Sequence, residues 1–156
     1  MNTLIKNTVD KTFRSHGFHK KSGTWYRESE ETMLVANLQK SQYSEVYYIN
    51  IGVWVKALGG NALPKEHQCH NRVRLGSLAG KQSDKALNAD DTSVSETERV
   101  VLILASIEQF GIPFMIANSS IPGIRNQLDS GNLSKALVHV KVKELVSSGT
   151  RDKWTT

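Results

Sequence analysis

The chain has 156 residues, a formal net charge of +5 and a single cysteine, Cys69. This length fits one domain spanning residues 1–156 with a core large enough to need no metal, and one cysteine excludes an intramolecular disulfide. Because the sequence has no secretory signal and no apolar run of membrane-spanning length, we predict a cytoplasmic protein without a membrane association.

The first part of the chain predicts a helix followed by an antiparallel β-meander. Apolar residues at helical spacing predict a helix over residues 3–16, and Gly17 stands at the position that ends it. Short alternating runs then follow one another, separated by Ser22-Gly23 and by Glu30-Glu31. We expect strands over residues 18–21, 24–28, 32–41 and 45–56.

A break rich in glycine and proline at residues 57–67 separates the meander from the second half of the chain. Residues 69–78 alternate well enough to predict one more strand. The polar and weakly patterned residues 80–93 predict a long loop.

The remainder of the chain predicts mainly helices. Ser95 and Glu98 form a capping box for a helix that we expect to run to Phe110, where Gly111 and Pro113 stop it. A shorter helix is expected from Ile121-Pro122 to about Ser130. Residues 133–146 combine the spacing of a helix with the alternation of a strand. They therefore predict either a helix or a helix–strand mixture.

These elements together predict an α+β fold. Its parts are an N-terminal helix, an antiparallel β-meander of about four to five strands, and C-terminal helices packed on one sheet face.

The two longest predicted strands indicate a working face on the sheet. Alternation places the apolar side chains of both strands on one face, covered by helices, and leaves a mixed face opposite, where Gly52 marks a close approach of another group. Amides beside aromatic and basic residues are typical of recognition surfaces, whereas a merely solvated sheet face is the alternative. The candidate partner-binding residues are Trp25, Arg27, Asn37, Gln39, Lys40, Ser41, Tyr48, Asn50 and Trp54.

Several of these residues also carry a resemblance to a known family. The pattern consists of G-F followed by basic residues, an aromatic–Tyr–Arg, N-x-Q-K-S, I-N-x-G and R-x-R-L-G, at residues 17–21, 25–27, 37–41, 49–52 and 72–76. It resembles a family of small bacterial domains catalogued as a domain of unknown function, over residues 3–80 and more loosely to about 130. Residues 80–94 depart from the pattern because they lack a tryptophan. The resemblance implies a fold group without a reaction.

Motifs for enzymatic chemistry are weak. His67, Cys69 and His70 are possible metal ligands, but no second pair stands at zinc spacing, so we predict no metal and no cofactor. Cys69 is better explained as a buried small residue than as a nucleophile. Phosphate loops, dinucleotide fingerprints and hydrolase motifs are missing from the sequence, which favours a protein that is not an enzyme.

Three functions follow as hypotheses. The first is a protein-binding module, most concretely an immunity-type protein that binds and neutralises a bacterial toxin, and the positive charge favours an acidic target surface. The second is a nucleic-acid binder with Trp25 and Tyr26 stacking on bases. Its phosphate contacts would come from Lys20, Lys21, Arg27, Lys40, Arg72 and Arg74. The third is a small enzyme with a site around Gln39, Lys40 and Asn50.

Overall fold

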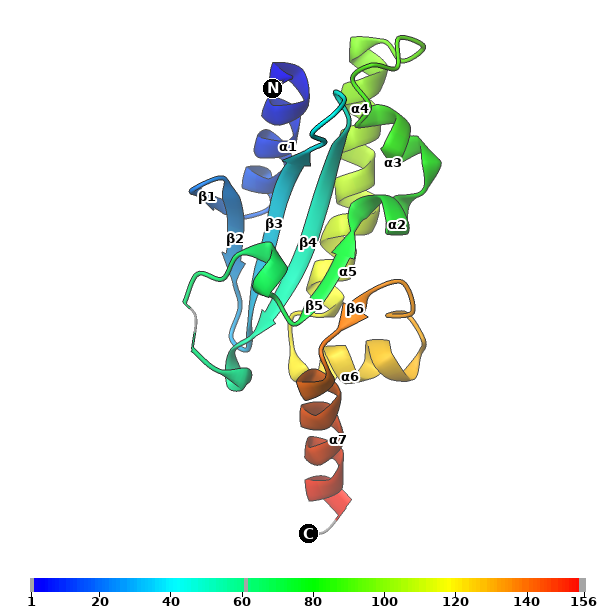
Figure 1. Cartoon of the computed structure of the whole chain (residues 1–156). Coiled ribbons are helices and arrows are strands. Elements are labelled where there is room, and N and C mark those ends of the chain that lie inside the picture. The colour runs from blue at the N-terminus through cyan, green and yellow to red at the C-terminus, as the bar shows by residue number, and fades with distance from the viewer. Residues whose placement is uncertain (1, 61, 155–156) are drawn as a thin grey trace.

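A computed structural model describes the backbone of residues 2–60 and 62–154, with side chains described up to Ser147. Helices cover one face of a six-stranded antiparallel sheet whose strand order is β1-β2-β3-β4-β5-β6 (Figure 1). The predicted α+β class, N-terminal helix and antiparallel meander are confirmed, and the sheet has one strand more than the longest meander expected. The first elements are α1 (Thr3–Ser15), β1 (His19–Lys21), β2 (Thr24–Glu28), β3 (Thr32–Lys40) and β4 (Tyr47–Val55).

The N-terminal helix α1 forms where the sequence predicts it. The Asn2 side chain accepts a hydrogen bond from the Ile5 amide at 3.0 Å, which satisfies one of the free donors of the first turn. Ile5, Val9 and Phe13 lie on the buried face of α1. The Phe13 ring stacks on Trp25 of β2 with ring centroids 5.4 Å apart, so α1 is anchored on the sheet by an aromatic pair.

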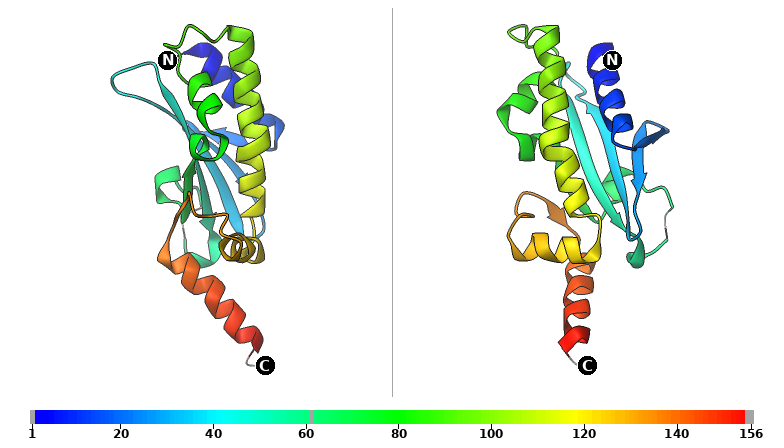
Figure 2. Two further views of the ribbon diagram at one scale, coloured as in Figure 1. Left: turned by 90° about the vertical axis from the view of Figure 1, so that its right-hand side faces the viewer. Right: turned by 180° about the vertical axis from the view of Figure 1, so that it is seen from behind.

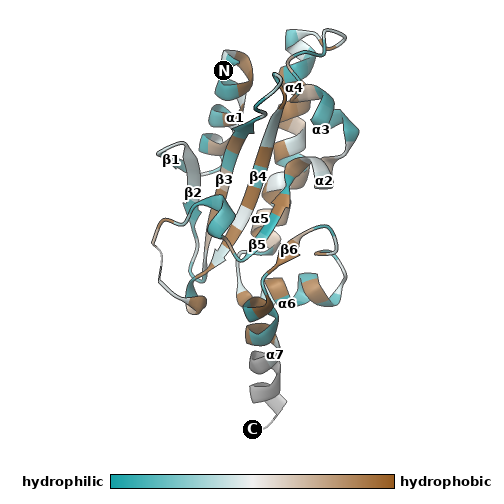
Figure 3. Ribbon diagram, in the orientation of Figure 1, coloured by the Kyte–Doolittle hydropathy of each residue, from teal (hydrophilic) through white to brown (hydrophobic). Residues whose placement is uncertain are grey.

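The pairing of β3 with β4 separates the two faces of the sheet. Leu34 lies opposite Val53 and Ala36 opposite Ile51, and all four side chains belong to the main core under the helices. On the other face the pairs change from apolar, Met33 with Trp54, to polar, Asn37 with Asn50, and β3 becomes more hydrophilic toward its C-terminal end (Figure 3). The alternation predicted for both strands is therefore confirmed.

The segment after β4 differs from the prediction in two places. The expected strand over residues 69–78 is the short β5 (Asn71–Arg74) followed by α2 (Leu75–Ala79), and the expected loop contains α3 (Lys81–Ala86). The cause is tertiary: the buried Arg99 guanidinium donates to the carbonyls of Ala86 at 2.8 Å and Asn88 at 2.7 Å. A helix end held by a side chain from the following helix has no local sequence pattern.

The long helix does not stop at Gly111 and Pro113, and that prediction is wrong. It continues through α4 (Glu96–Ser106), a π-helical turn (Ile107–Gly111) and α5 (Ile112–Ala117). The Ile112 amide donates to the Ile107 carbonyl in the wider π turn, and Pro113 then takes an early position of α5, where a missing N–H costs little.

This continuous helix, Glu96–Ala117, has 22 residues and is long and apolar enough to cross a membrane by length and composition. The expectation that no apolar stretch approaches that length is thus corrected. Ile103, Ile107 and Met115 are at most 1% exposed in the main core, and the helix runs along the covered face of the sheet (Figure 2). The core helix of a globular domain passes the same test, and 39% of the apolar stretch of this helix is buried.

The C-terminal part resolves the region that the sequence left open. After α6 (Ile121–Asp129), the chain adds the two-residue strand β6 (Leu137–Val138) to the edge of the sheet beside β5. The last helix, α7 (Val140–Trp154), contacts α6 and extends away from the sheet (Figures 1 and 2). Residues 133–146 are therefore a strand and a helix in succession.

The uncovered face of the sheet, called the outer face below, is partly overlaid by residues 56–70. Tyr26, Met33, Val35 and Cys69 form a second, smaller core beneath this segment. A Cβ atom built on Gly52 would lie 2.7 Å from both Cβ and Sγ of Cys69. The close approach that was predicted at Gly52 is confirmed, and Cys69 is the group that approaches.

Substituting Gly52 tests this packing. We expect Gly52→Ala to destabilise the protein by about 1–3 kcal/mol, because the added methyl group must displace Cys69 from the strand. Chemical denaturation of the variant and the parent measures the change. Gly60→Ala is the control, since a Cβ there meets nothing within 4 Å. Equal stability of Gly52→Ala and the parent would contradict the close approach.

Candidate functional site

The half of the outer face that residues 56–70 leave uncovered carries a group of polar and aromatic side chains. The register places Asn37 opposite Asn50 and Gln39 opposite Tyr48 on β3 and β4, and Asn50 opposite Arg74 on β4 and β5. Antiparallel neighbours of this kind point their side chains to the same face. We call Asn37, Gln39, Tyr48, Asn50 and Arg74 the amide patch.

One chain of hydrogen bonds orients the amides of this patch. Arg74 Nε donates to Asn50 Oδ1 at 3.3 Å, and Asn50 Nδ2 donates to Asn37 Oδ1 at 2.9 Å and to Gln39 Oε1 at 3.0 Å. Arginine can only donate, so Asn50 must turn its oxygen toward Arg74 and its NH₂ toward the other two amides. Asn37 and Gln39 then accept through their oxygens, and their NH₂ groups have no partner in the described part of the chain.

The guanidinium of Arg74 is held from a second direction. Its Cζ lies 4.1 Å from the centroid of the Tyr48 ring, a cation–π contact between β5 and β4. Nε and the face of the guanidinium make these two contacts, so the Nη groups of Arg74 are available to bind a ligand or a partner. The patch therefore presents amide and guanidinium donors in defined positions.

A pocket of about 380 Å³ lies beside the patch on the outer face. It is lined by Asn37, Gln39, Asn50, Glu66, His67, Arg72, Val73, Arg74, Ser77, Lys135 and Leu137. Glu66 is 4% exposed and holds Arg72 in a two-pronged ion pair, with Oε1 3.1 Å from Nε and Oε2 3.3 Å from Nη2. Arg74 and Ser77 also line a second pocket of about 470 Å³, together with Tyr48 and Asp84.

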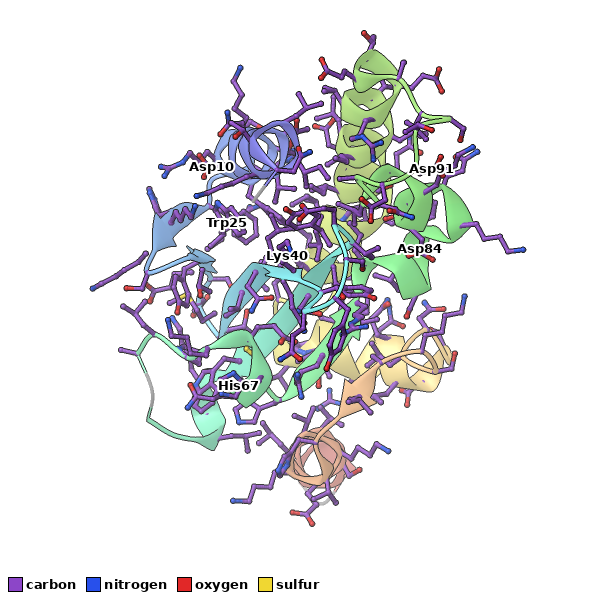
Figure 4. The ribbon with its side chains drawn as sticks, turned by 45° about the horizontal axis from the view of Figure 1, so that its top comes forward. Asp10, Trp25, Lys40, His67, Asp84 and Asp91 are labelled. Atoms are coloured by element: carbon purple, nitrogen blue, oxygen red, sulfur yellow. The ribbon has the colours of Figure 1, made fainter. Side chains whose placement is uncertain are left out.

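Three of the predicted site residues, Trp25, Arg27 and Lys40, lie on the other face of the sheet. Trp25 pairs with Ala36 and is 1% exposed, and its Nε1 donates to Asp10 Oδ1 at 2.9 Å (Figure 4). Arg27 shares that face, and its Nη1 donates to the His16 carbonyl at 3.2 Å. Their placement on the surface with the amides is thus wrong, because the β2–β3 register pairs Trp25 with a core position.

The indole N–H of Trp25 also affects the pKa of Asp10. Burial acts to raise the pKa of this carboxyl, but the hydrogen bonds from Trp25 and Arg14 outweigh it and hold the pKa below its usual value. Asp10 is therefore a structural partner of the α1–β2 contact.

The other predicted residues divide between the patch and its surroundings. Lys40 alternates onto the face opposite Gln39, and its Nζ lies 3.4 Å from Glu45 Oε1. Ser41 begins the connection to β4, where its amide donates to the Val46 carbonyl at 2.8 Å. Trp54 is on the outer face but at its far end, against a separate pocket, with Nε1 donating to the Gly59 carbonyl. The structure thus brings together Asn37, Gln39, Tyr48 and Asn50.

Among the pocket residues that were missing from the predicted surface, four carry a charge: Glu66, Arg72, Arg74 and Lys135. Arg72 and Arg74 alternate within the R-x-R-L-G stretch, a signal that places both on one face of a strand. The sequence holds no comparable signal for Lys135, which reaches the pocket because β6 pairs with β5.

The histidine and cysteine side chains of residues 67–70 diverge. His67 lines the pocket, Cys69 is buried against Gly52, and the His70 ring lies 4.3 Å from the Trp54 ring. Within residues 2–60 and 62–147, no three His, Cys, Asp or Glu side chains gather closely enough to hold a metal. Burial, followed by the charge of Glu66, raises the pKa of Cys69 to about 12, so the thiol is not an activated nucleophile.

A comparison with protein families places the chain in one of them. The family described as a domain of unknown function, DUF4304, matches residues 9–117, which is more than half of the chain. The chain therefore belongs to the DUF4304 family. The match runs from α1 to the end of α5 and leaves α6, β6 and α7 outside. Searches of curated proteins and of solved structures found no match.

Thiol labelling tests the environment of Cys69. We expect the native protein to react with a disulfide reagent far more slowly than the denatured protein at about pH 8, because Cys69 is buried and its pKa is about 12. Absorbance of the released thiolate follows the reaction. Equal rates for the native and denatured protein would contradict the burial of this thiol.

The pH dependence of stability tests His70. Burial, followed by the charges of His139 and Lys141, lowers the pKa of His70 below 6.5, and its Nδ1 accepts from the Val55 amide at 2.9 Å. The unfolded state then binds the proton more readily, so this contribution to stability is present above pH 6.5 and declines as the pH falls through that value toward the folded pKa.

We expect His70→Asn to lose less stability than the parent between neutral pH and about pH 5, because the asparagine oxygen can replace Nδ1 without titrating. Denaturation midpoints at several pH values measure the difference. His19→Asn, on the exposed edge strand β1, is the control. A parent and His70→Asn variant with parallel pH profiles would show that His70 does not contribute.

Proposed function

We propose that this protein is a non-enzymatic protein-binding module of the immunity type, which binds and neutralises a bacterial toxin through the amide patch. The observation that supports this proposal is the chain of hydrogen bonds from Arg74 through Asn50 to Asn37 and Gln39. Side chains held in one geometry before binding lose little conformational entropy when a partner arrives.

The composition of the patch supports a protein partner. Tyr48 and Arg74 belong to the residue types that contribute most to protein–protein affinity, and here they are stacked on each other. The neighbouring amides supply orienting hydrogen bonds at the centre of the surface. The connection from Ser41 to Val46 and residues 56–70 border the patch, and Tyr43 in the former is 94% exposed.

Two observations favour this function over the alternatives. Trp25 and Tyr26 are 1% and 6% exposed, so neither ring offers a face on which a base of a nucleic acid could stack. For an enzyme around Gln39, Lys40 and Asn50, the lysine would have to share the face of the two amides, whereas its ammonium approaches Glu45 on the other side of the strand.

Affinity capture with matched variants tests the proposal. The tagged chain, a Gln39→Ala/Tyr48→Ala variant and a Gln109→Ala control are used to capture proteins from a lysate of the source organism. Gln109 is an exposed glutamine outside the patch. We expect one stoichiometric protein with the parent and the control, and its loss with the patch variant.

Growth assays then test the immunity role. We expect the captured protein to arrest growth when it is expressed alone, and co-expression of the parent chain to restore growth. Thermal melting of each variant excludes unfolding as the cause of lost capture. A partner retained by the patch variant, or recovery of nucleic acid that washes off with salt, would contradict the proposal.

A further inference from the structure

The pocket beside the amide patch is lined by hydrogen-bond donors whose partners are missing. The oxygens of Asn37 and Gln39 accept from Asn50, so their NH₂ groups point away from it. These NH₂ groups have no partner among the described residues. The Nη groups of Arg74 and the ammonium of Lys135 likewise have no partner among the described residues, and all four side chains line the same pocket. Four donor groups without a partner among the described residues therefore line one pocket, beside the Glu66 carboxylate that Arg72 binds.

The local charge of the pocket is positive, because its only ion pair, Glu66 with Arg72, is neutral and two further cations remain among the described residues. Glu66 and Arg72 neutralise each other through two contacts, and Glu66 is 4% exposed beneath them. Arg74 and Lys135 then remain as two positive charges without an acidic partner. Asp84 lines the adjoining pocket together with Arg74, but the two form no ion pair in the described part of the chain.

Lys135 comes from a segment outside the part of the chain that matches the family. Pairing of β5 with β6 sets Arg72 opposite Leu137, and both side chains line the pocket. The C-terminal segment thereby closes one wall of a pocket whose other walls belong to the family domain at residues 9–117. A site assembled from both parts can differ in specificity from one built by the family domain alone.

We propose that this pocket binds a carboxylate, with Arg74 and Lys135 as its cationic contacts and the Asn37 and Gln39 amides as additional donors. Arginine beside neutral donors is well suited to a planar, singly charged carboxylate. Phosphate, which a guanidinium also binds, is the competing anion, and its tetrahedral oxygens match the planar guanidinium and amide donors less well than a carboxylate does. The source of the carboxylate is an acidic segment of the protein partner, and only this source rests on the proposed function.

Nuclear magnetic resonance titration of the full chain tests the pocket without any partner. The probes are acetate, neutral acetamide and inorganic phosphate, added at constant ionic strength, and the readout is the side-chain NH₂ signals of Asn37 and Gln39. We expect acetate to shift these signals saturably, acetamide to shift them little, and phosphate to bind more weakly than acetate.

Charge-removing variants identify the contacts. We expect Arg74→Gln and Lys135→Gln each to weaken acetate binding by about tenfold, the size of one charge-assisted hydrogen bond. Lys141→Gln, an exposed lysine on α7 that does not line the pocket, should leave it unchanged. Lys135→Gln keeps the test decisive if Arg74→Gln disturbs the fold, because the Lys135 ammonium has no partner among the described residues.

Two results would overturn the proposal: acetate and acetamide acting alike, or phosphate binding more tightly than acetate. Its failure is separable from that of the proposed function. A captured partner retained by Arg74→Gln and Lys135→Gln but lost with Gln39→Ala/Tyr48→Ala would support the module and overturn the carboxylate pocket. Saturable acetate binding without any captured partner would support the pocket and overturn its use in protein binding.

Discussion

The pairing of β3 with β4 is the constraint on which the rest of the structure depends. It sets nine residues of each strand side by side and so decides which side chains meet the helices and which meet the solvent. A slip of one residue would carry Asn50 into the core in place of Ile49 and Ile51, which would be exposed instead. The cost of burying an amide without partners holds this register in place. The amide patch is thus a direct consequence of the same pairing that forms the core.

The outer face is divided into two parts by the segment that follows β4. At one end, residues 56–70 fold back over the sheet, and the absence of a side chain at Gly52 lets Cys69 come close. At the other end the strands stay uncovered, and Asn50 joins the polar side chains by hydrogen bonds. A small core and a polar surface therefore share one sheet face, with Glu66 and Arg72 as an ion pair at the boundary.

The C-terminal segment adds a strand to the edge of the sheet that the family domain forms. An exposed edge strand invites pairing with another chain, and β6 covers β5 by extending the sheet. The same pairing places Lys135 and Leu137 against the pocket. One short strand thus protects an edge and also completes a wall, which couples the stability of the sheet to the chemistry of the proposed carboxylate site.

The sequence by itself determined the elements whose side chains repeat with one period. α1, β2 and the two faces of β3 and β4 were predicted within a residue or two because their burial pattern is local and regular. Asn37, Gln39, Tyr48 and Asn50 were assigned to one surface for the same reason. Tertiary structure decided what local periodicity does not contain: the face of β2 toward which Trp25 points, α3 held by Arg99, and the π turn that carries the helix past Pro113. It also brought Arg74 and Lys135 to one pocket, because strand pairing joins residues that are far apart in the chain.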